Sequence, residues 1–267
     1  MGVVKKEGEY SWIRYTHQRI EKNKNALYTI SGPTGSGKSW SALMMCLLND
    51  PSFTAKRCVF TAKELMNLIN SDELRKGSAV MFDEAGIEMN SRTWNSITNK
   101  MLNYLIQTFR HRNIILIFTS PYLDFIDSAT RKLFHAEFET LYINPVNKTC
   151  SLKPKLLQYN SERRKFYRKY LRVRGNGHGY IPLKRWSIPK PPMELVNAYE
   201  IKKGEFTRKL NERIVADLEK VDVKKRPRYL HTCDYCDYMW EGLAKEPKWC
   251  PTCRRRLKYG KNPKKTE

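Results

Sequence analysis

Acidic residues and long apolar runs are both scarce in this sequence. Of its 267 residues, 27 are Asp or Glu and 50 are Lys or Arg, which gives a formal net charge of +23 at pH 7. A balance this basic indicates a polyanionic partner such as DNA, RNA or an anionic membrane surface. No run approaches the about 18 apolar residues of a membrane span, and the opening MGVVKKEGEYSW lacks the apolar centre of a signal peptide. We therefore expect a cytoplasmic protein, in the host-cell cytoplasm if the chain is viral.

Cysteine is also sparse, and its spacing argues against a disulfide framework. There are seven cysteines, an odd number, and four of them form two C-x-x-C pairs. In a chain without a secretion signal, such pairs indicate metal binding in a reducing compartment. The remaining three, Cys46, Cys58 and Cys150, have apolar neighbours and are predicted to lie in the core.

The positive charge is concentrated in the second half of the chain. Residues 1–150 hold 19 basic and 14 acidic residues, whereas residues 151–267 hold 31 basic and 13 acidic. We expect the first half to be a nearly neutral enzyme core and the second half to contact the polyanion.

Short apolar runs alternate with helical patterns over the first 134 residues. Strands are predicted at 27–31, 57–60, 79–82 and 114–118, and helices at 39–48, after the cap residue Thr61, and at 93–109. This alternation predicts an α/β fold with right-handed crossovers and a mainly parallel sheet. Alternating runs on both sides of residues 144–147 predict an antiparallel hairpin at the sheet edge.

A phosphate-binding loop follows the first predicted strand. The segment matches G-x-x-x-x-G-K-[ST] in full and consists of Gly32, Pro33, Thr34, Gly35, Ser36, Gly37, Lys38 and Ser39. Glycines let backbone N–H groups converge on a phosphate, the lysine reaches the β- and γ-phosphates, and the serine hydroxyl binds Mg²⁺. A strand before the motif and a helix after it are the context that an ATP-binding loop requires.

Two carboxylates end the third predicted strand, 45 residues after Lys38. Beside a phosphate-binding loop, Asp83 is expected to hold Mg²⁺ and Glu84 to polarise the attacking water. The alternative for this pair alone is a solvated acidic turn.

Polar residues after the fourth predicted strand are candidates for sensing the γ-phosphate. Thr119 and Ser120 stand there, and we assign the role to Ser120, although an ordinary turn into Pro121 is an equal alternative. A transition-state arginine is sought among four candidates, of which Arg131 is our choice. The other three are Arg92, Arg110 and Arg112.

The two cysteine pairs have the spacing of a zinc ribbon. Cys233 and Cys236 are separated by 13 residues from Cys250 and Cys253. Four thiolates around Zn²⁺ leave no open coordination position, so the site is predicted to be structural, and metal would supply folding energy on the order of 10 kcal/mol.

A basic segment with interleaved aromatic residues follows the predicted hairpin. Seven side chains are candidates for phosphate contacts with nucleic acid: Arg163, Arg164, Lys165, Arg168, Lys169, Arg172 and Arg174. The alternative is a solvated strand face. After it, the helical period of 193–221 predicts a long helix with a core or partner-facing stripe.

Composition and motifs together divide the chain into three regions. Residues 1–160 are expected to form the P-loop ATPase core, 161–228 a basic extension with the long helix, and 229–267 a zinc ribbon with a basic tail.

The motifs resemble the HerA/FtsK-type branch of the P-loop ATPases, and within it the zonula occludens toxin-like ATPases of viruses and mobile elements. The resemblance covers residues 20–160, through GPTGSGKS, VMFDEAG, QTFRHRN and IILIFTSPYLDFIDSATRKLFHAEFE. It implies a ring-forming ATPase, such as a hexamer, that moves or packages duplex DNA. Lys38, Ser39, Asp83 and Glu84 match the family's nucleotide, magnesium and catalytic positions. Ser120 stands where the family usually has Gln, and the membrane span of its filamentous-phage members is lacking.

The sequence thus favours an ATP-hydrolysing motor that translocates or packages double-stranded DNA, using ATP, Mg²⁺ and a structural Zn²⁺. Two alternatives stay open: a nucleotide-switched DNA-binding or replication-accessory protein with little turnover, and a P-loop nucleotide kinase. Stimulation of turnover by DNA separates the first two, and phosphoryl transfer to a nucleoside would identify the third.

Overall fold

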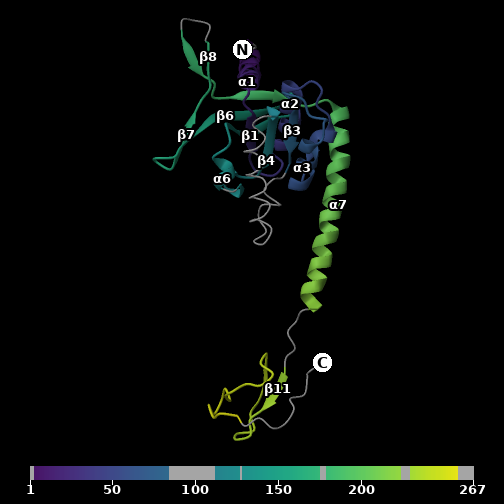
Figure 1. The fold of residues 1–267 in the computed structure, drawn as a ribbon, viewed down its shortest axis with the longest axis vertical. Helices are drawn as coiled ribbons and strands as arrows, with labels where there is room; N and C mark the ends of the chain where they lie inside the picture. Colours follow the sequence, from purple (N-terminus) through teal and green to yellow (C-terminus); the bar gives the residue numbers. More distant parts are fainter. Residues whose placement is uncertain (1–2, 84–111, 127, 175–178, 224–228, 258–267) are drawn as a thin grey trace. The chain divides into compact units, whose positions relative to one another are not determined.

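The computed structural model divides the chain into two compact units, residues 1–206 and 207–267. It describes residues 3–83, 112–126, 128–174, 179–223 and 229–257. The helix predicted at 93–109 therefore lies outside the described residues. Figure 1 labels the elements used below.

A central sheet of eight strands organises the first unit. Five neighbouring strands are parallel, in the order β5-β1-β4-β3-β2. Their bounds are β1 Ala26–Ser31, β2 Cys58–Val59, β3 Ala79–Phe82, β4 Ile115–Ser120 and β5 Ala136–Asn144. Because β1 lies between β4 and β5, and β4 separates it from β3, this is the crossover topology of an α/β nucleotide-binding fold. The predicted mainly parallel sheet is confirmed.

Antiparallel strands extend the β5 edge of the sheet. β6 (Thr149–Asn160) pairs with β5, and both β10 (Trp186–Pro189) and β7 (Lys165–Lys169) pair with β6. The predicted hairpin around residues 144–147 is thus confirmed. Two strands of the basic segment, β7 and β10, belong to the sheet as well. β8 (Arg172–Arg174) and β9 (Tyr180–Pro182) form a separate two-stranded hairpin.

Helices cover both faces of the sheet. Their bounds are α1 Val3–Glu21, α2 Lys38–Asn49, α3 Ala62–Asn70, α6 Ser128–Arg131 and α7 Met193–Val223, with short 3-10 turns η1 Ala55–Arg57 and η3 Leu123–Phe125. α3 begins at the predicted cap, because the Thr61 side chain accepts the Glu64 N–H at 3.1 Å. None of the helices described combines the length and apolar character that crossing a membrane requires.

The strand alternation distributes apolar side chains between two core clusters. Along β4, Ile115 and Ile117 belong to one cluster, and Leu116 and Phe118 belong to the other. The first cluster contains residues of α1, α2 and the start of α7, whereas the second contains residues of α3. The sheet is therefore buried on both faces, as a parallel sheet requires.

The second unit contains the later turns of α7 and a small two-stranded sheet. β11 (Tyr229–Thr232) and β12 (Met239–Gly242) pair antiparallel. Cys233 and Cys236 lie between the two strands, and Cys250 and Cys253 follow β12 in the sequence. A short bridge between Trp249 and Arg256 closes the second cysteine pair into a loop of its own.

Candidate functional site

The phosphate-binding loop joins β1 to α2, as the sequence predicts. Gly35 and Gly37 have φ angles of 76° and 88°, a left-handed conformation that glycine adopts without strain. Gly32 is constrained by a neighbour, since a Cβ atom there would lie 1.8 Å from Thr140 Oγ1. The loop thus has the tight backbone turns that direct N–H groups toward a bound anion.

The β5–β6 hairpin braces the loop from one side. Thr140 Oγ1 donates to the Ser31 carbonyl at 3.1 Å and accepts from the Ser36 hydroxyl, whose oxygen lies 2.7 Å away. The Cys150 thiol lies 3.5 Å from the Ser36 carbonyl. Cys150 is buried, as predicted, and it also contacts the loop, which the apolar environment in the sequence did not indicate.

The Lys38 side chain contacts the backbone of its own loop. Its Nζ donates to the Pro33 carbonyl at 2.8 Å. This contact keeps the ammonium above the same backbone turn where phosphates would be held, so it is positioned to neutralise them.

Ser39 and Asp83 meet, although 44 residues separate them. Ser39 Oγ donates to Asp83 Oδ1 at 3.1 Å, and Thr119 Oγ1 donates to the same oxygen at 2.5 Å. Asp83 is fully buried at the end of β3. A serine hydroxyl and a carboxylate are the oxygen ligands that Mg²⁺ prefers, so this pair fits the predicted magnesium site in donor type and placement.

Two side chains of α7, which the sequence reasoning missed, bind the other oxygen of Asp83. Tyr199 OH donates to Asp83 Oδ2 at 2.5 Å, and Lys203 Nζ lies 3.1 Å from that oxygen. Lys203 Nζ is also 5.7 Å from the centre of the Tyr199 ring. The signal in the sequence is the i, i+4 spacing of Tyr and Lys on the predicted stripe, but nothing local identifies Asp83 as their partner.

Tyr199 stays protonated beside the carboxylate. Burial raises its pKa well above the ordinary value, and the negative charge of Asp83 raises it further. The phenol therefore acts as a hydrogen-bond donor to Asp83 throughout the usual pH range.

The remaining predicted catalytic residues divide between described and undescribed segments. Ser120 Oγ donates to the Tyr122 carbonyl at 2.8 Å, so its hydroxyl bonds within its own turn. Arg131 forms an ion pair with Asp124 through Nη1. Glu84, Arg92 and Arg110 lie outside the described residues. Thr119, rather than Ser120, is the strand-end side chain that contacts Asp83.

The second unit brings the four predicted zinc ligands together. The Sγ atoms of Cys233, Cys236, Cys250 and Cys253 all lie within 4.8 Å of one another. Two of their separations, Cys233–Cys253 and Cys236–Cys250, are 3.6 and 3.8 Å. Sulfur atoms around a tetrahedral zinc with Zn–S bonds of about 2.3 Å lie about 3.8 Å apart. The cluster therefore fits Zn²⁺ in number, chemistry and spacing.

Both cysteine turns use the same backbone geometry. The residue after each pair, Asp237 and Arg254, has a left-handed φ of 56° and 55°. Its N–H donates back to the carbonyl of the first cysteine, at 3.1 Å for Cys233 and 3.0 Å for Cys250. Burial tends to raise the pKa of Cys250, but N–H donors from Cys253 and Thr252 outweigh it and lower the pKa to about 6. At Cys250 a thiolate, the form that binds metal, is thereby favoured. At Cys236 the backbone hydrogen bond from Tyr238 lowers the pKa, but burial and the neighbouring thiols outweigh it and raise the pKa.

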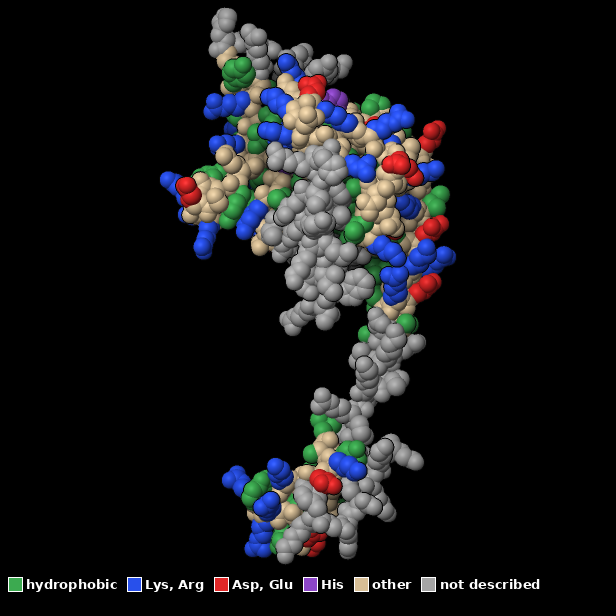
Figure 2. Space-filling view, in the orientation of Figure 1, with side chains coloured by type: hydrophobic (Ala, Val, Ile, Leu, Met, Phe, Trp, Pro, Cys, Tyr) green, Lys and Arg blue, Asp and Glu red, His purple; other side chains and the backbone are tan. Residues whose placement is uncertain are grey.

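The basic segment forms an exposed edge of the first unit. Figure 2 shows blue Lys and Arg side chains at the projecting β6–β7 hairpin. The described side chains of Arg163, Arg164, Lys165, Arg168, Lys169 and Arg172 are exposed, and Arg174 ends β8. Arg168 Nε lies 3.2 Å from Glu137, which also accepts a hydrogen bond from Ser31 at 3.4 Å. This pairing links the basic edge to the strand that leads into the phosphate-binding loop.

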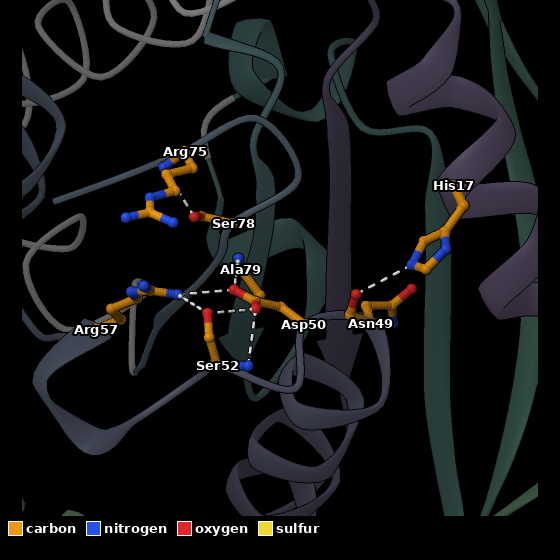
Figure 3. Close-up of polar contacts among 8 residues, drawn as sticks. All are labelled: His17, Asn49, Asp50, Ser52, Arg57, Arg75, Ser78 and Ala79. Atoms are coloured by element: carbon orange, nitrogen blue, oxygen red, sulfur yellow. Dashed lines mark hydrogen bonds and ion pairs between the residues drawn. The ribbon is translucent and has the colours of Figure 1, made fainter. Parts of the chain in front are cut away.

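A cavity of about 670 Å³ lies beside the end of α2 and the start of β3. Figure 3 shows the polar contacts among residues at this place. Asp50, after α2, accepts the Ser52 N–H at 3.0 Å, the Ala79 N–H at 2.9 Å and Arg57 Nη1 at 2.7 Å. Burial raises its pKa, but the hydrogen bonds from Ser52 and Ala79 and the charge of Arg57 outweigh this and lower it. Because these partners saturate its carboxylate, Asp50 joins α2 to β3.

Comparison with solved structures gives distant likenesses. No protein-family model matches the chain, and no curated protein sequence matches it. The N-terminal domain of zonular occludens toxin from Neisseria meningitidis is similar at 17% identity, over 55% of this chain and 95% of that one, with a TM-score of 0.34. Thermomonospora curvata EccC (ATPases 2 and 3), solved with a signal sequence peptide, is similar at 9% identity, over 64% of this chain and 38% of that one, with a TM-score of 0.33. Both TM-scores are below 0.5, and the P-loop ATPase-like α/β fold follows from the sheet order and the loop geometry of this chain.

Proposed function

We propose that the chain is an ATP-hydrolysing motor that translocates or packages double-stranded DNA, as a protein of a virus or mobile element. The observation that carries the ATPase part is the hydrogen bond between Ser39 of the phosphate-binding loop and Asp83 at the end of β3. Two segments far apart in sequence place there the hydroxyl and carboxylate that Mg²⁺-nucleotide hydrolysis uses.

Each residue of the loop has a distinct task in this proposal. Backbone N–H groups around Gly35 and Gly37 would bind phosphate oxygens, and Lys38 would neutralise the β- and γ-phosphates. Ser39 and Asp83 would hold Mg²⁺, which supplies positive charge to the phosphates when it is bound. Glu84 is proposed to orient and polarise water, with Ser120 as sensor and Arg131 as the arginine that stabilises transferring charge.

The DNA part of the proposal is supported by charge. The exposed basic edge around β7 carries arginines and lysines with tyrosine and phenylalanine between them, which suits phosphate contact and stacking. The ribbon would add a second module held together by Zn²⁺. A ring of identical subunits, such as a hexamer, is the assembly proposed for moving duplex DNA.

ATP hydrolysis, measured with and without duplex DNA, tests the enzymatic proposal. Wild-type protein should hydrolyse ATP in a Mg²⁺-dependent way, and DNA should accelerate it. Lys38→Ala should abolish turnover because the phosphate charge is no longer neutralised, and Glu84→Gln should retain ATP binding while losing hydrolysis. ATP binding without turnover in the wild type would favour a nucleotide-switched DNA-binding protein, and phosphoryl transfer to a nucleoside would favour a kinase.

Binding of duplex DNA across a salt series tests the DNA part separately. Several phosphate contacts should give a slope of log affinity against log salt of roughly −4 or steeper, at about −0.9 per contact. Reversing Arg163, Arg164 and Lys165 to Glu should flatten the slope and weaken binding to all sequences alike. The matched control reverses Lys261, Lys264 and Lys265 in the tail. Equal effects from the two triple variants would contradict a specific role for the β6–β7 hairpin.

A further inference from the structure

A small cavity of about 230 Å³ adjoins the phosphate-binding loop. Gly37, Trp40 and Ser41, from the loop and the first turn of α2, form one side of it. The β5–β6 hairpin contributes Ile143 and Cys150, and Lys190 follows β10. The loop and the β5–β6 hairpin are in close contact here, since a Cβ atom on Gly37 would lie 3.3 Å from Cys150 Sγ and 3.4 Å from Ile143.

The position of the cavity along the loop is set by the sheet order. The magnesium-binding end of the site is at Asp83 on β3, and the cavity is beside β5 and β6. In the order β6-β5-β1-β4-β3, these lie on opposite sides of β1, the strand that leads into the loop. A triphosphate with its γ-phosphate at Asp83 would therefore point its sugar and base toward the cavity.

The chemistry of the cavity suits a flat aromatic group. Its lining is mainly apolar, and Trp40 exposes 38% of its surface although it stands next to Ser39 of the motif. Lys190 Nζ lies 4.6 Å from the centre of the indole ring, which keeps positive charge at the cavity. The volume is below the roughly 300–1,000 Å³ of pockets that enclose a whole drug-sized ligand, so it suits one part of a nucleotide.

We propose that this cavity binds the nucleobase of the nucleoside triphosphate, with the base held by stacking on Trp40 between the β5–β6 hairpin and Lys190. The proposal rests on the proposed function, because the phosphate-binding loop must hold the triphosphate for the base to reach the cavity. Trp40 is then a specificity-determining residue, because it raises the affinity for a nucleotide above that for a polyphosphate without a base.

Calorimetric titration of the full chain with Mg²⁺-ATP and with Mg²⁺-tripolyphosphate tests this proposal. Wild type should bind ATP more tightly than inorganic tripolyphosphate, which has no base. Trp40→Ala should weaken ATP binding at least about five-fold, the low end of the cost of removing a base-stacking aromatic side chain. Its affinity for tripolyphosphate should not change, and Trp40→Phe should recover most of the ATP affinity.

Tyr142→Ala is the matched control, because Tyr142 is an exposed aromatic residue next to Ile143 that does not line the cavity. It should bind both ligands as wild type does. Equal loss of ATP and tripolyphosphate affinity in Trp40→Ala would overturn the base assignment, since Trp40 would then act on the loop. An unchanged ATP affinity would overturn it as well. Failure of wild type to bind either ligand would instead contradict the proposed nucleotide function, and the base site with it.

Discussion

Each of the two units of the chain is stabilised internally by different interactions. The first has two apolar clusters, one on each face of its sheet, with large side chains such as Trp12, Phe118 and Trp186 fully buried. In the described part of the second, the buried apolar side chains are Cys233 and Cys250, whereas Met239, Leu243 and Trp249 are each about 60% exposed. Burial of apolar surface can stabilise the first unit alone. The second has too small a core for this, so we expect its fold to depend on a metal ion held by the four cysteines.

Removing zinc should have the largest effect, and it should be confined to the second unit. Purified, reduced protein is expected to carry one Zn²⁺ per chain by elemental analysis. Chelation or Cys250→Ser should unfold residues 229–257, because the lost binding energy is on the order of 10 kcal/mol. Hydrogen exchange should show loss of protection there and none in β1 or β4.

The control for that experiment is Cys46→Ala, which removes a buried thiol of the first unit. It should keep the zinc content at one. Reduced protein without zinc, or a chelator that melts both units together, would contradict a dependence on zinc that is confined to the second unit.

Lys203→Met tests whether charge as well as apolar burial holds the first unit. The variant leaves the buried Asp83 carboxylate without its ammonium partner, so the free energy of unfolding should fall by about 3 kcal/mol. Added Mg²⁺ should stabilise the variant more than the wild type, because the ion supplies the missing charge. Denaturant unfolding with and without Mg²⁺ measures both effects.

Lys209→Met is the matched control, since Lys209 is exposed on the same helix. It removes one positive charge and should change stability little. If the two variants lose stability equally, the contact between Lys203 and Asp83 does not contribute to the stability of the first unit.

Lowering the pH should gradually reduce the free energy of unfolding of the first unit, because His135 takes up a proton more readily in the unfolded chain. Burial, and then the charges of Arg19 and Lys24, lower its pKa to about 3, and the neutral ring accepts the Leu27 N–H at 3.0 Å. The unfolded chain binds the proton near pH 6.5, so the free energy of unfolding should fall as the pH drops from 6.5 toward 3. The expected loss is about 2 kcal/mol between pH 7 and pH 5.

Urea unfolding at several pH values measures this dependence. His135→Gln should have a flatter profile, whatever its stability at pH 7. A wild-type profile that is flat between pH 7 and pH 5 would contradict the role assigned to His135.

The sequence predicts the parts of this molecule whose signals are local. The phosphate-binding loop, the strand ending in Asp83 and the capped helix after Thr61 all depend on neighbours within a few residues. The cysteine cluster could also be predicted from the sequence, because the ligands of a zinc ribbon have characteristic spacing. Regular periodicity and fixed motif spacing therefore sufficed for the fold class and for part of the site.

Contacts between distant segments could not be predicted in the same way. Tyr199 and Lys203 reach Asp83 across more than a hundred residues, and Thr140 reaches Gly32 across a comparable distance. These partners are chosen by the order of strands and by the placement of a helix on the sheet, which no local pattern encodes. Trp40 is an intermediate case, since its position after the motif is visible in the sequence but the cavity beside it is not.

The ion pair between Lys203 and Asp83 changes the charge that surrounds this carboxylate when a metal ion binds. A buried carboxylate with no partner would gain two positive charges when a divalent ion arrives, whereas Asp83 already holds one from Lys203. Ser39 and Asp83 Oδ1 would hold the magnesium ion, while Oδ2 keeps the ammonium of Lys203 beside it. The carboxylate therefore has a positive partner before any metal or nucleotide binds, and it avoids the cost of a bare buried charge. That partner belongs to α7, the helix that continues into the second unit.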